Sequence, residues 1–315
     1  MRVLVAGGGG FIGSHLVDRF LDRGDTVVAI DSFVTGRRQN LDHVDVGDRF
    51  ELVEHDITLE LPDLGRFDAV LNFASPASPD DFATMPIQIL ETGSIGNRRL
   101  LDLATACGAR FLLASTSEVY GDPQVHPQSE NYVGSVDPVG PRSCYDEAKR
   151  FAEAMTVAYG NHRGTDVAIA RIFNTYGERM APFDGRVVST FIVQALAGLP
   201  LSVHGDGTQT RSFCHVSDLV EGLVALFDSD RRGPVNIGEP TEVTVTAFAE
   251  MVIDVTGSTS LVTYTPLPDQ RGGDPQRRCP DIGLAHSILG WEPVVSLVDG
   301  LTATVEYFQG VERLG

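Results

Sequence analysis

The sequence predicts an α/β fold, a Rossmann-type doubly wound parallel sheet with a smaller C-terminal α/β domain. Three observations indicate this fold. Short apolar runs alternate with helical patterns through the first half of the chain, a glycine-rich turn follows the first run, and polar clusters follow later runs. Such alternation is typical of a parallel sheet that binds ligands at the carboxyl ends of its strands.

The predicted elements follow in chain order. Strand patterns predict strands at 3–6, 26–30, 51–55, 69–73, 111–114 and 167–171, and the short, apolar, β-branched run at 3–6 predicts a buried parallel strand. Amphipathic patterns predict helices at about 87–107 and 144–160. After about residue 174 the pattern breaks into shorter elements and turns. We therefore expect a first domain over 1–173, which also takes parts of 212–240, and a second domain over 174–315, interleaved with it.

The first turn has the glycine spacing of a dinucleotide-binding site. Gly7 permits a tight turn, Gly10 lets the backbone approach a pyrophosphate, and Gly13 lets the next helix pack closely on its strand. The free N–H groups at the start of that helix then face the phosphates. We expect this turn to bind a dinucleotide.

An acidic residue follows the second predicted strand. Asp31 stands where a carboxylate accepts hydrogen bonds from the adenosine ribose and disfavours a 2′-phosphate. This position predicts NAD. Arg37 and Arg38 follow soon after, so NADP is an alternative.

A second motif, Tyr145-x-x-x-Lys149, predicts acid–base chemistry. Residues four apart share one face of a helix. There a lysine can lower the pKa of a phenol from about 10 toward neutrality, because a nearby cation favours the phenolate. A tyrosinate is a general base for an alcohol that is about to lose hydride. The spacing recurs by chance on many helices, and it gains weight here from the glycine turn at the start of the chain.

The composition argues against several classes of binding partner. Lys and Arg number 24 and Asp and Glu number 43, which gives a net charge of −19. Because a nucleic-acid surface requires a basic face, this charge argues against a nucleic-acid partner. No apolar run approaches the roughly 18 residues of a membrane span. The four cysteines lack metal-ligand or disulfide spacing, so we expect small buried side chains in a reducing cytoplasm and no metal: Cys107, Cys144, Cys214 and Cys279.

Beyond these patterns, the chain resembles the extended short-chain dehydrogenase/reductases that act on nucleotide sugars. It is most similar to the UDP-glucuronate decarboxylases, also called UDP-xylose synthases, and the similarity is nearly end to end. The segments that point to this branch are the Ala-Ser-Pro repeat at 74–79, the Pro-Arg-Ser-Cys-Tyr-Asp-Glu helix start at 141–147 and Asp-Gly-Arg-Val-Val-Ser at 184–189.

The resemblance implies a reaction without net redox change. A bound NAD⁺ oxidises the sugar's C4 hydroxyl, with Tyr145 taking the proton and Lys149 holding the ribose. The resulting β-keto acid loses carbon dioxide, the enolate gains a proton at C5, and hydride returns to C4. Thr116 is expected to hydrogen-bond the reacting hydroxyl region, and Glu118 to position substrate or deliver a proton through water.

The resemblance also implies the binding residues. Those expected at the cofactor are Gly7, Gly10, Phe11, Ile12, Gly13, Asp31, Phe33, Thr35, Gly36, Asp56, Ile57, Phe73, Ala74, Ser75, Thr92, Ala114, Tyr145, Lys149 and Thr175. Those expected at the UDP-sugar are Pro76, Thr116, Asn174, Arg186, Val187, Arg211 and Arg278. Among these, Arg211 is suited to bidentate contact with a diphosphate.

Position 118 weighs against two related activities. The 4,6-dehydratases carry Asp-Glu where this chain has Ser117-Glu118, and 4-epimerases usually carry a small or hydroxyl residue in place of Glu118. A UDP-glucuronate 4-epimerase giving UDP-galacturonate remains the nearest alternative. A non-catalytic NAD-binding regulatory protein is an alternative from another class.

Four residues depart from the decarboxylase pattern. Glu91 and Gly93 stand where the family usually reads Lys and Asn, Phe82 replaces a tyrosine, and Cys279 replaces a basic residue. Glu91 reverses a charge near the expected anionic substrate. Separately, the predicted helices at about 87–107 and 144–160 carry more apolar residues than one sheet face covers. The family resemblance implies that they pair across a two-fold axis, so we expect a homodimer.

Overall fold

A parallel sheet forms the centre of the molecule. The computed structural model describes residues 1–266 and 276–312. The sheet has seven strands in the order β11-β6-β5-β4-β1-β2-β3, and every neighbouring pair is parallel. The strands are β1 (Arg2–Ala6), β2 (Thr26–Asp31), β3 (Phe50–Glu54), β4 (Ala69–Asn72), β5 (Arg110–Thr116), β6 (Val167–Ile172) and β11 (Pro234–Ile237). The predicted fold class is confirmed.

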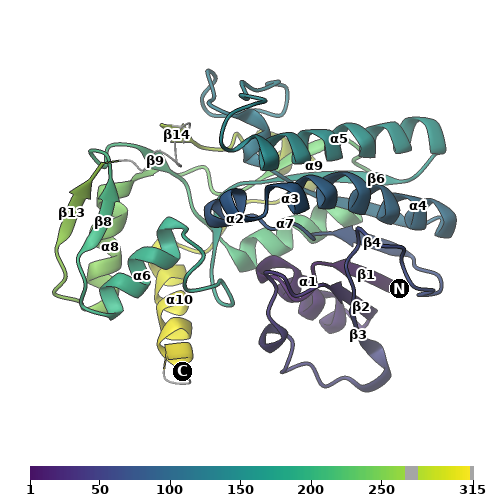
Figure 1. Ribbon diagram of the computed structural model, residues 1–315, viewed down its shortest axis with the longest axis horizontal. Coiled ribbons are helices and arrows are strands. Elements are labelled where there is room, and N and C mark those ends of the chain that lie inside the picture. Colours follow the sequence, from purple (N-terminus) through teal and green to yellow (C-terminus); the bar gives the residue numbers. More distant parts are fainter. Residues whose placement is uncertain (267–275, 313–315) are drawn as a thin grey trace.

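Helices cover both faces of this sheet (Figure 1). On one face, α1 (Phe11–Asp22) and α7 (Val216–Asp228) bury Leu16, Phe20 and Leu223 against the strands. On the other face, α4 (Asn97–Cys107) and α5 (Ser143–Arg163) bury Leu100 and Ala152. Most of these strands are buried on both sides, which explains why they read as continuous apolar runs, whereas the edge strand β3 exposes Glu51 and Glu54.

The helix predicted at 87–107 is interrupted. It consists of α3 (Pro86–Glu91), a π-helical turn η3 (Thr92–Gly96) and α4. Two glycines in the turn allow close approach: a Cβ at Gly93 would lie 2.8 Å from the Ala148 side chain on α5, and one at Gly96 would lie 2.7 Å from Ile57. Periodicity alone did not predict this break.

A second unit has its own core. Helices α6 (Val187–Leu196), α8 (Val245–Thr256) and α10 (Leu297–Glu312) surround Phe191, Phe248 and Phe308. Beside them, β8 (Leu201–His204) pairs with β13 (Val262–Thr265). A small sheet joins β9 (Thr210–Arg211) to β12 (Val243–Thr244) and β14 (Arg277–Arg278). In Figure 1 this unit lies beside the main sheet, at the left of the view.

The chain crosses between the two units more than once. Strands β7 (Thr175–Tyr176) and β10 (Cys214–His215) pair where the chain leaves and re-enters the main sheet. The chain then adds α7 and β11 to the sheet before returning to the second unit, and α9 (Gly283–Leu289) packs against α7 and β11. Among the residues that the structure describes, no helix is both long and apolar enough to cross a membrane.

Candidate active site

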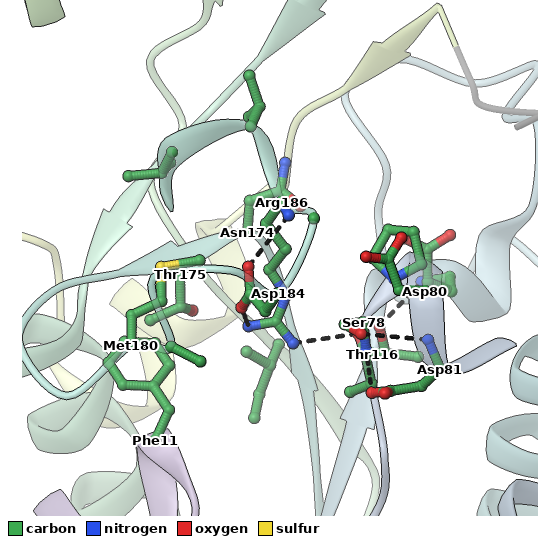
Figure 2. A pocket seen from close by; sticks show the side chains of 18 of the residues that line it. Phe11, Ser78, Asp80, Asp81, Thr116, Asn174, Thr175, Met180, Asp184 and Arg186 are labelled. Carbon is green, nitrogen blue, oxygen red and sulfur yellow. Dashed lines mark hydrogen bonds and ion pairs between the residues drawn. The ribbon is translucent and has the colours of Figure 1, made fainter. Parts of the chain in front are cut away.

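One large cavity lies where the two units meet. It has a volume of about 660 Å³ and is lined by the glycine turn, the end of β5, the start of α5 and segments of the second unit. Figure 2 shows Thr116 on one side of this cavity and Asn174, Asp184 and Arg186 on the other. The carboxyl ends of the sheet strands therefore open onto the second unit, as the fold class predicts.

The glycine turn has the shape of a phosphate cradle. A Cβ at Gly7 would lie 2.7 Å from the backbone of Phe73 and Ala74, and one at Gly13 would lie 2.0 Å from the carbonyl oxygen of Gly7. Gly10 caps α1 without any side-chain hydrogen bond. No side chain of the cap residue therefore accepts from the first N–H groups of α1, which suits this helix start to binding an anion.

Asp31 organises the rim of this turn. Its carboxylate accepts hydrogen bonds from the backbone N–H of Gly9 at 2.9 Å and of Phe33 at 2.8 Å. Burial raises the pKa of Asp31, and these two N–H groups oppose that rise. A carboxylate has further lone pairs, so these bonds leave it able to accept from a ligand hydroxyl.

The two arginines that follow Asp31 are held by the protein. Arg37 Nη2 donates to the carbonyl oxygen of Arg179 at 2.7 Å. Arg38 pairs with Glu54 and lies over the ring of Phe33 at 4.3 Å. Both guanidinium groups thus have partners within the chain.

Tyr145 and Lys149 share the buried face of α5, and their side chains reach the cavity. Burial raises the pKa of Tyr145 to about 12, and a hydrogen bond with Thr116 opposes this rise. Burial lowers the pKa of Lys149 to about 8, and its Nζ donates to the carbonyl oxygen of Ala114 at 2.9 Å. The Nζ lies 5.7 Å from the centre of the Tyr145 ring. In the chain alone the phenol is therefore protonated, and the expected lowering of its pKa by Lys149 is absent.

Glu118 is held between two arginines. Its Oε2 lies 2.7 Å from Arg142 Nη2, and its Oε1 accepts from Arg278 Nη1. Burial alone would raise the pKa of Glu118, but the two guanidinium groups lower it to about 2. The side chains are at most 14% exposed, so this charge cluster is shielded from water. At neutral pH Glu118 is an ionised carboxylate.

Arg186 joins the second unit to the loop before α2 (Pro79–Thr84). Its Nη2 donates to the carbonyl oxygen of Ala77 at 3.1 Å, and its Nη1 lies 3.5 Å from Asp184. Asp184 also accepts from the Arg186 backbone N–H and the Ser189 hydroxyl, which fixes the start of α6. These contacts are among those drawn in Figure 2. On β9, Arg211 donates to the carbonyl oxygen of Thr210 and also lines the cavity.

Most of the predicted site residues line this cavity. They are Gly7, Gly10, Phe11, Ile12, Gly13, Thr35, Phe73, Ser75, Ala114, Thr116, Glu118, Tyr145, Lys149, Asn174, Thr175, Arg186, Val187, Arg211 and Arg278. Eight others lie outside the lining: Asp31, Phe33, Gly36, Asp56, Ile57, Ala74, Pro76 and Thr92.

Several of the residues outside the lining have a structural role in their immediate surroundings. Gly36 approaches Asp31 closely, since a Cβ at Gly36 would lie 2.8 Å from the Asp31 carboxylate. Asp56 accepts from the Thr58 N–H, and Ile57 packs in the core. The Thr92 hydroxyl donates to the carbonyl oxygen of Gln88 within the helix.

The departures from the family pattern fall mostly away from the cavity. Glu91 is exposed at the end of α3 and does not line the cavity, so its charge is not set against a ligand there. Phe82 does line the cavity and stacks on Tyr145 with ring centres 4.9 Å apart. Cys279, which follows Arg278 in the chain, is buried and does not line the cavity. Cys107 is only half-buried, unlike the other three cysteines.

One group of potential metal ligands was not visible in the sequence. The ligand atoms of His126, Glu242 and Cys279 lie within 4.8 Å of one another, outside the cavity lining. Glu242 already pairs with His126 at 2.8 Å and with Arg277 at 3.5 Å. These contacts satisfy the group without an ion.

Three lining or neighbouring residues were missed in the sequence. Arg142 pairs with Glu118, Asp184 holds Arg186, and Asp146 is buried beside the Glu118 cluster. Arg142 and Asp146 are four apart on α5, the same spacing that drew attention to Tyr145 and Lys149. That spacing was the available signal.

Comparison with known proteins defines the class. A family model described as GDP-mannose 4,6 dehydratase matches residues 4–304. The chain belongs to this family, and the resemblance seen in the sequence is confirmed.

Within that class, the chain belongs with the UDP-glucuronic acid decarboxylases. It is 50% identical over 307 residues to UDP-glucuronic acid decarboxylase 1 of Danio rerio, covering 98% of this chain and 72% of that protein.

Solved structures share the fold. The UDP-glucose 4-epimerase of Thermotoga maritima, solved with UDP-glucose, superposes with a TM-score of 0.91 at 30% identity, covering 99% of this chain and all of that one. A variant of the UDP-glucuronic acid 4-epimerase of Bacillus cereus, solved with a fluorinated UDP-sugar and NAD, superposes with a TM-score of 0.87 at 28% identity, covering 99% of this chain and 100% of that chain.

Proposed function

We propose that this protein is an NAD-dependent decarboxylase that converts UDP-glucuronate to UDP-xylose. The observation that supports this proposal is the set of residues that line one cavity. It combines a glycine cradle, the Tyr145–Lys149 pair and Glu118 held between two guanidinium groups. The proposed reaction is the one named for the UDP-glucuronic acid decarboxylases, one of which shares 50% sequence identity with this chain.

The residues of the cradle fit NAD. The open N–H groups at the start of α1 suit a pyrophosphate, and Asp31 stands at the end of β2 for the adenosine ribose. Arg37 and Arg38 would have to break contacts within the protein to bind a 2′-phosphate. These contacts favour NAD over NADP. The related 4-epimerase of Bacillus cereus was solved with NAD.

The residues of the glycine cradle would hold NAD⁺, which would supply a hydride acceptor for C4 of the sugar and a donor for its return. Tyr145 takes the proton of the C4 hydroxyl, and Thr116 hydrogen-bonds the same region. In the chain alone the pKa of the buried Tyr145 phenol is about 12, so its deprotonation requires nearby positive charge. Lys149 and the positive charge of the oxidised cofactor both favour the phenolate. Tyr145 returns the proton to O4 at the end of the cycle.

The decarboxylation itself needs little from the protein. With a ketone at C4, the bond from C5 to the carboxylate breaks, carbon dioxide leaves, and the electron pair becomes an enolate. A proton from water or an exchangeable group then bonds to C5. Because the pKa of Glu118 is about 2, this carboxylate positions substrate and the two arginines and does not store the proton.

The remaining lining residues are assigned by chemistry. Arg211 and Asn174, on the second-unit side, suit the diphosphate and nucleotide. Arg186 and Val187 line the same side, and Arg278 stands at the sugar end beside Glu118. The residues at 7–13 suit the cofactor phosphates.

Product analysis tests the proposal. Incubating the protein with UDP-glucuronate and a catalytic amount of NAD⁺ is expected to yield UDP-xylose and carbon dioxide, identified by mass and NMR. A product of unchanged mass with inverted C4 would instead make the protein a 4-epimerase, the activity named for its relative from Bacillus cereus. A tight NAD complex that turns over no nucleotide sugar would indicate a regulatory protein.

We also infer that two copies of the chain pair through α3 and α5. These helices pack against one another and carry exposed apolar side chains, among them Ile87 at 61% and Phe151 at 50% exposure. In Figure 1, α3 lies next to α5. An apolar surface of this kind is typical of a protein interface, and pairing with the same surface of a second copy would cover it.

We further propose a cytoplasmic location. All four cysteines are free thiols, and free thiols are the usual state in a reducing compartment. Fractionation of the producing cells, with the protein detected outside the cytoplasmic fraction, would contradict this.

A further inference from the structure

A buried asparagine lies outside the cavity lining, close to the segments that carry Glu118 and Arg278. Asn236 is on β11, an edge strand of the main sheet, and it is fully buried. It does not line the cavity. A buried amide needs partners for its polar atoms, so the hydrogen bonds of Asn236 show which segments it joins.

Tyr120 determines the orientation of the Asn236 amide. Arg171 Nη1 donates to the Tyr120 hydroxyl at 3.0 Å, and a guanidinium group can only donate. Burial raises the pKa of Tyr120 to about 12, so at neutral pH the hydroxyl keeps its proton and donates it to Asn236 Oδ1 at 2.7 Å. Oδ1 is therefore the atom that faces Tyr120, and Nδ2 donates elsewhere.

The Nδ2 group of Asn236 holds the chain where β14 ends. It donates to the carbonyl oxygens of Gln128 at 2.9 Å and of Asp281 at 3.1 Å. Gln128 in turn binds both backbone polar groups of Cys279. Its N–H donates to the Cys279 carbonyl oxygen, and its Oε1 accepts from the Cys279 N–H, both at 2.9 Å. Because Cys279 follows Arg278 directly, these bonds fix the position of the Arg278 backbone.

The hydrogen bonds of Asn236 close a ring with the ion pair. Tyr120 is the last residue of η4 (Ser117–Tyr120), the 3₁₀ turn that carries Glu118. On the other side, the bonds of Nδ2 hold the end of β14, the strand that carries Arg278. The contact between Glu118 and Arg278 joins these two segments a second time. Asn236 therefore anchors both partners of the ion pair.

The anchor is itself held firmly. Strand β11 pairs with β6 over all four of its residues, Pro234–Ile237. The backbone N–H of Asn236 donates to Glu130 Oε1 at 2.8 Å, which ties the segment after Gln128 to the same strand. A side chain fixed in this way can set the geometry of charged groups that it does not touch.

We propose that Asn236 is a positioning residue that sets the geometry of the Glu118–Arg278 pair, and through this pair the sugar end of the substrate site. Glu118 and Arg278 both line the cavity, so a shift of either changes what the sugar meets. The inference rests on the proposed function for the identity of the substrate. Asn236 acts through Tyr120 on one side and Gln128 on the other.

A double-mutant cycle tests this role, because residues that act on one geometry do not have additive effects. Asn236→Ala removes the amide, and Arg278→Lys keeps the charge but loses the planar guanidinium. In wild type, Asn236→Ala is expected to lower kcat/KM for UDP-glucuronate by about 10–10²-fold, since a binding group is misplaced. In Arg278→Lys, the same change is expected to cost less than about threefold. The dissociation constant for NAD⁺ is expected to stay at its wild-type value.

Asn97→Ala is the matched control. Asn97 is also a fully buried asparagine, bonded to Asn72 and to the Ala152 carbonyl oxygen, and it belongs neither to the ring nor to the cavity lining. Its effect is expected to be the same in wild type and in Arg278→Lys. Equal factors for Asn236→Ala in the two backgrounds would overturn the inference, as would a loss of NAD⁺ affinity as large as the loss of kcat/KM.

Two further measurements keep the test decisive. If Asn236→Ala does not fold, Tyr120→Phe opens the same ring by removing one hydroxyl and takes its place in the cycle. If wild type makes no UDP-xylose, the proposed function fails instead, and the cycle is measured by urea unfolding. The double variant is then expected to lose less free energy of unfolding than the sum of the two single variants, and a loss equal to that sum would overturn the role of Asn236.

Discussion

Replacing Glu118 by Gln is expected to destabilise the protein through the two arginines that it neutralises. The pKa of Glu118 falls from its ordinary 4.5 to about 2, which corresponds to roughly 3 kcal/mol in favour of the ionised carboxylate in the folded protein. The side chain is 13% exposed, so solvent screens this interaction only in part. Removing one partner of a buried pair also leaves the other charge uncompensated.

The pH dependence has a definite sign. Because the pKa of Glu118 is lowered in the folded state, its contribution is present above pH 4.5 and is lost as the pH falls toward 2. We expect the free energy of unfolding of Glu118→Gln to be about 3 kcal/mol lower than that of wild type at pH 7, and the difference to disappear only as the pH falls from 4.5 toward 2.

Urea unfolding followed by circular dichroism measures this difference. Glu147→Gln, which removes a carboxylate with a side chain 38% exposed, is the control and is expected to change stability by less than about 0.5 kcal/mol. Equal stability of Glu118→Gln and wild type at pH 7 would refute the view that Glu118 is held as an ionised carboxylate. So would a difference that grows as the pH falls.

Three further predictions concern catalysis, cofactor choice and assembly. Tyr145→Phe removes one hydroxyl and is expected to keep the wild-type melting temperature while lowering kcat by about 10²–10⁴-fold, so activity within threefold of wild type would show that Tyr145 is not the base. Calorimetric titration is expected to show much tighter binding of NAD⁺ than of NADP⁺, because Arg37 and Arg38 are engaged within the protein; a preference for NADP⁺ would contradict this. Light scattering at micromolar concentration is expected to give a dimer mass for wild type and a monomer mass for Phe151→Glu, which places a charge on the exposed apolar face of α5; a wild-type monomer would refute the interface.

The strands of the main sheet could be predicted from the sequence because each strand is specified by its own short run of residues. Each predicted strand up to 167–171 corresponds to an observed strand within two residues at either end, and most of these strands are continuous apolar runs because they are buried on both faces. The glycine turn and the Tyr145–Lys149 pair were equally readable, because short fixed spacings determine their geometry. The resemblance to the decarboxylase family then predicted residues of the second unit that line the cavity.

Long-range contacts were beyond such reasoning. Nothing local shows that Arg142 and Arg278, 136 residues apart in the numbering, converge on Glu118 and hold it ionised. The same holds for the pKa of Tyr145, which burial raises to about 12 without the expected lowering by Lys149. The π-helical turn at Thr92–Gly96 depends on Ala148 and Ile57, which pack on it from elsewhere in the chain.

The fate of the hydrogens on the sugar tests the proposed mechanism most directly. UDP-glucuronate carrying deuterium at C4 is turned over in ordinary water, unlabelled substrate is turned over in D₂O, and both products are analysed by NMR. The mechanism predicts UDP-xylose that keeps its deuterium at C4 in the first case and gains one deuterium at C5 in the second. A product that retains its carboxylate, has an inverted C4 and gains no solvent deuterium at C5 would contradict decarboxylation while leaving the chemistry of Tyr145 and Lys149 in place.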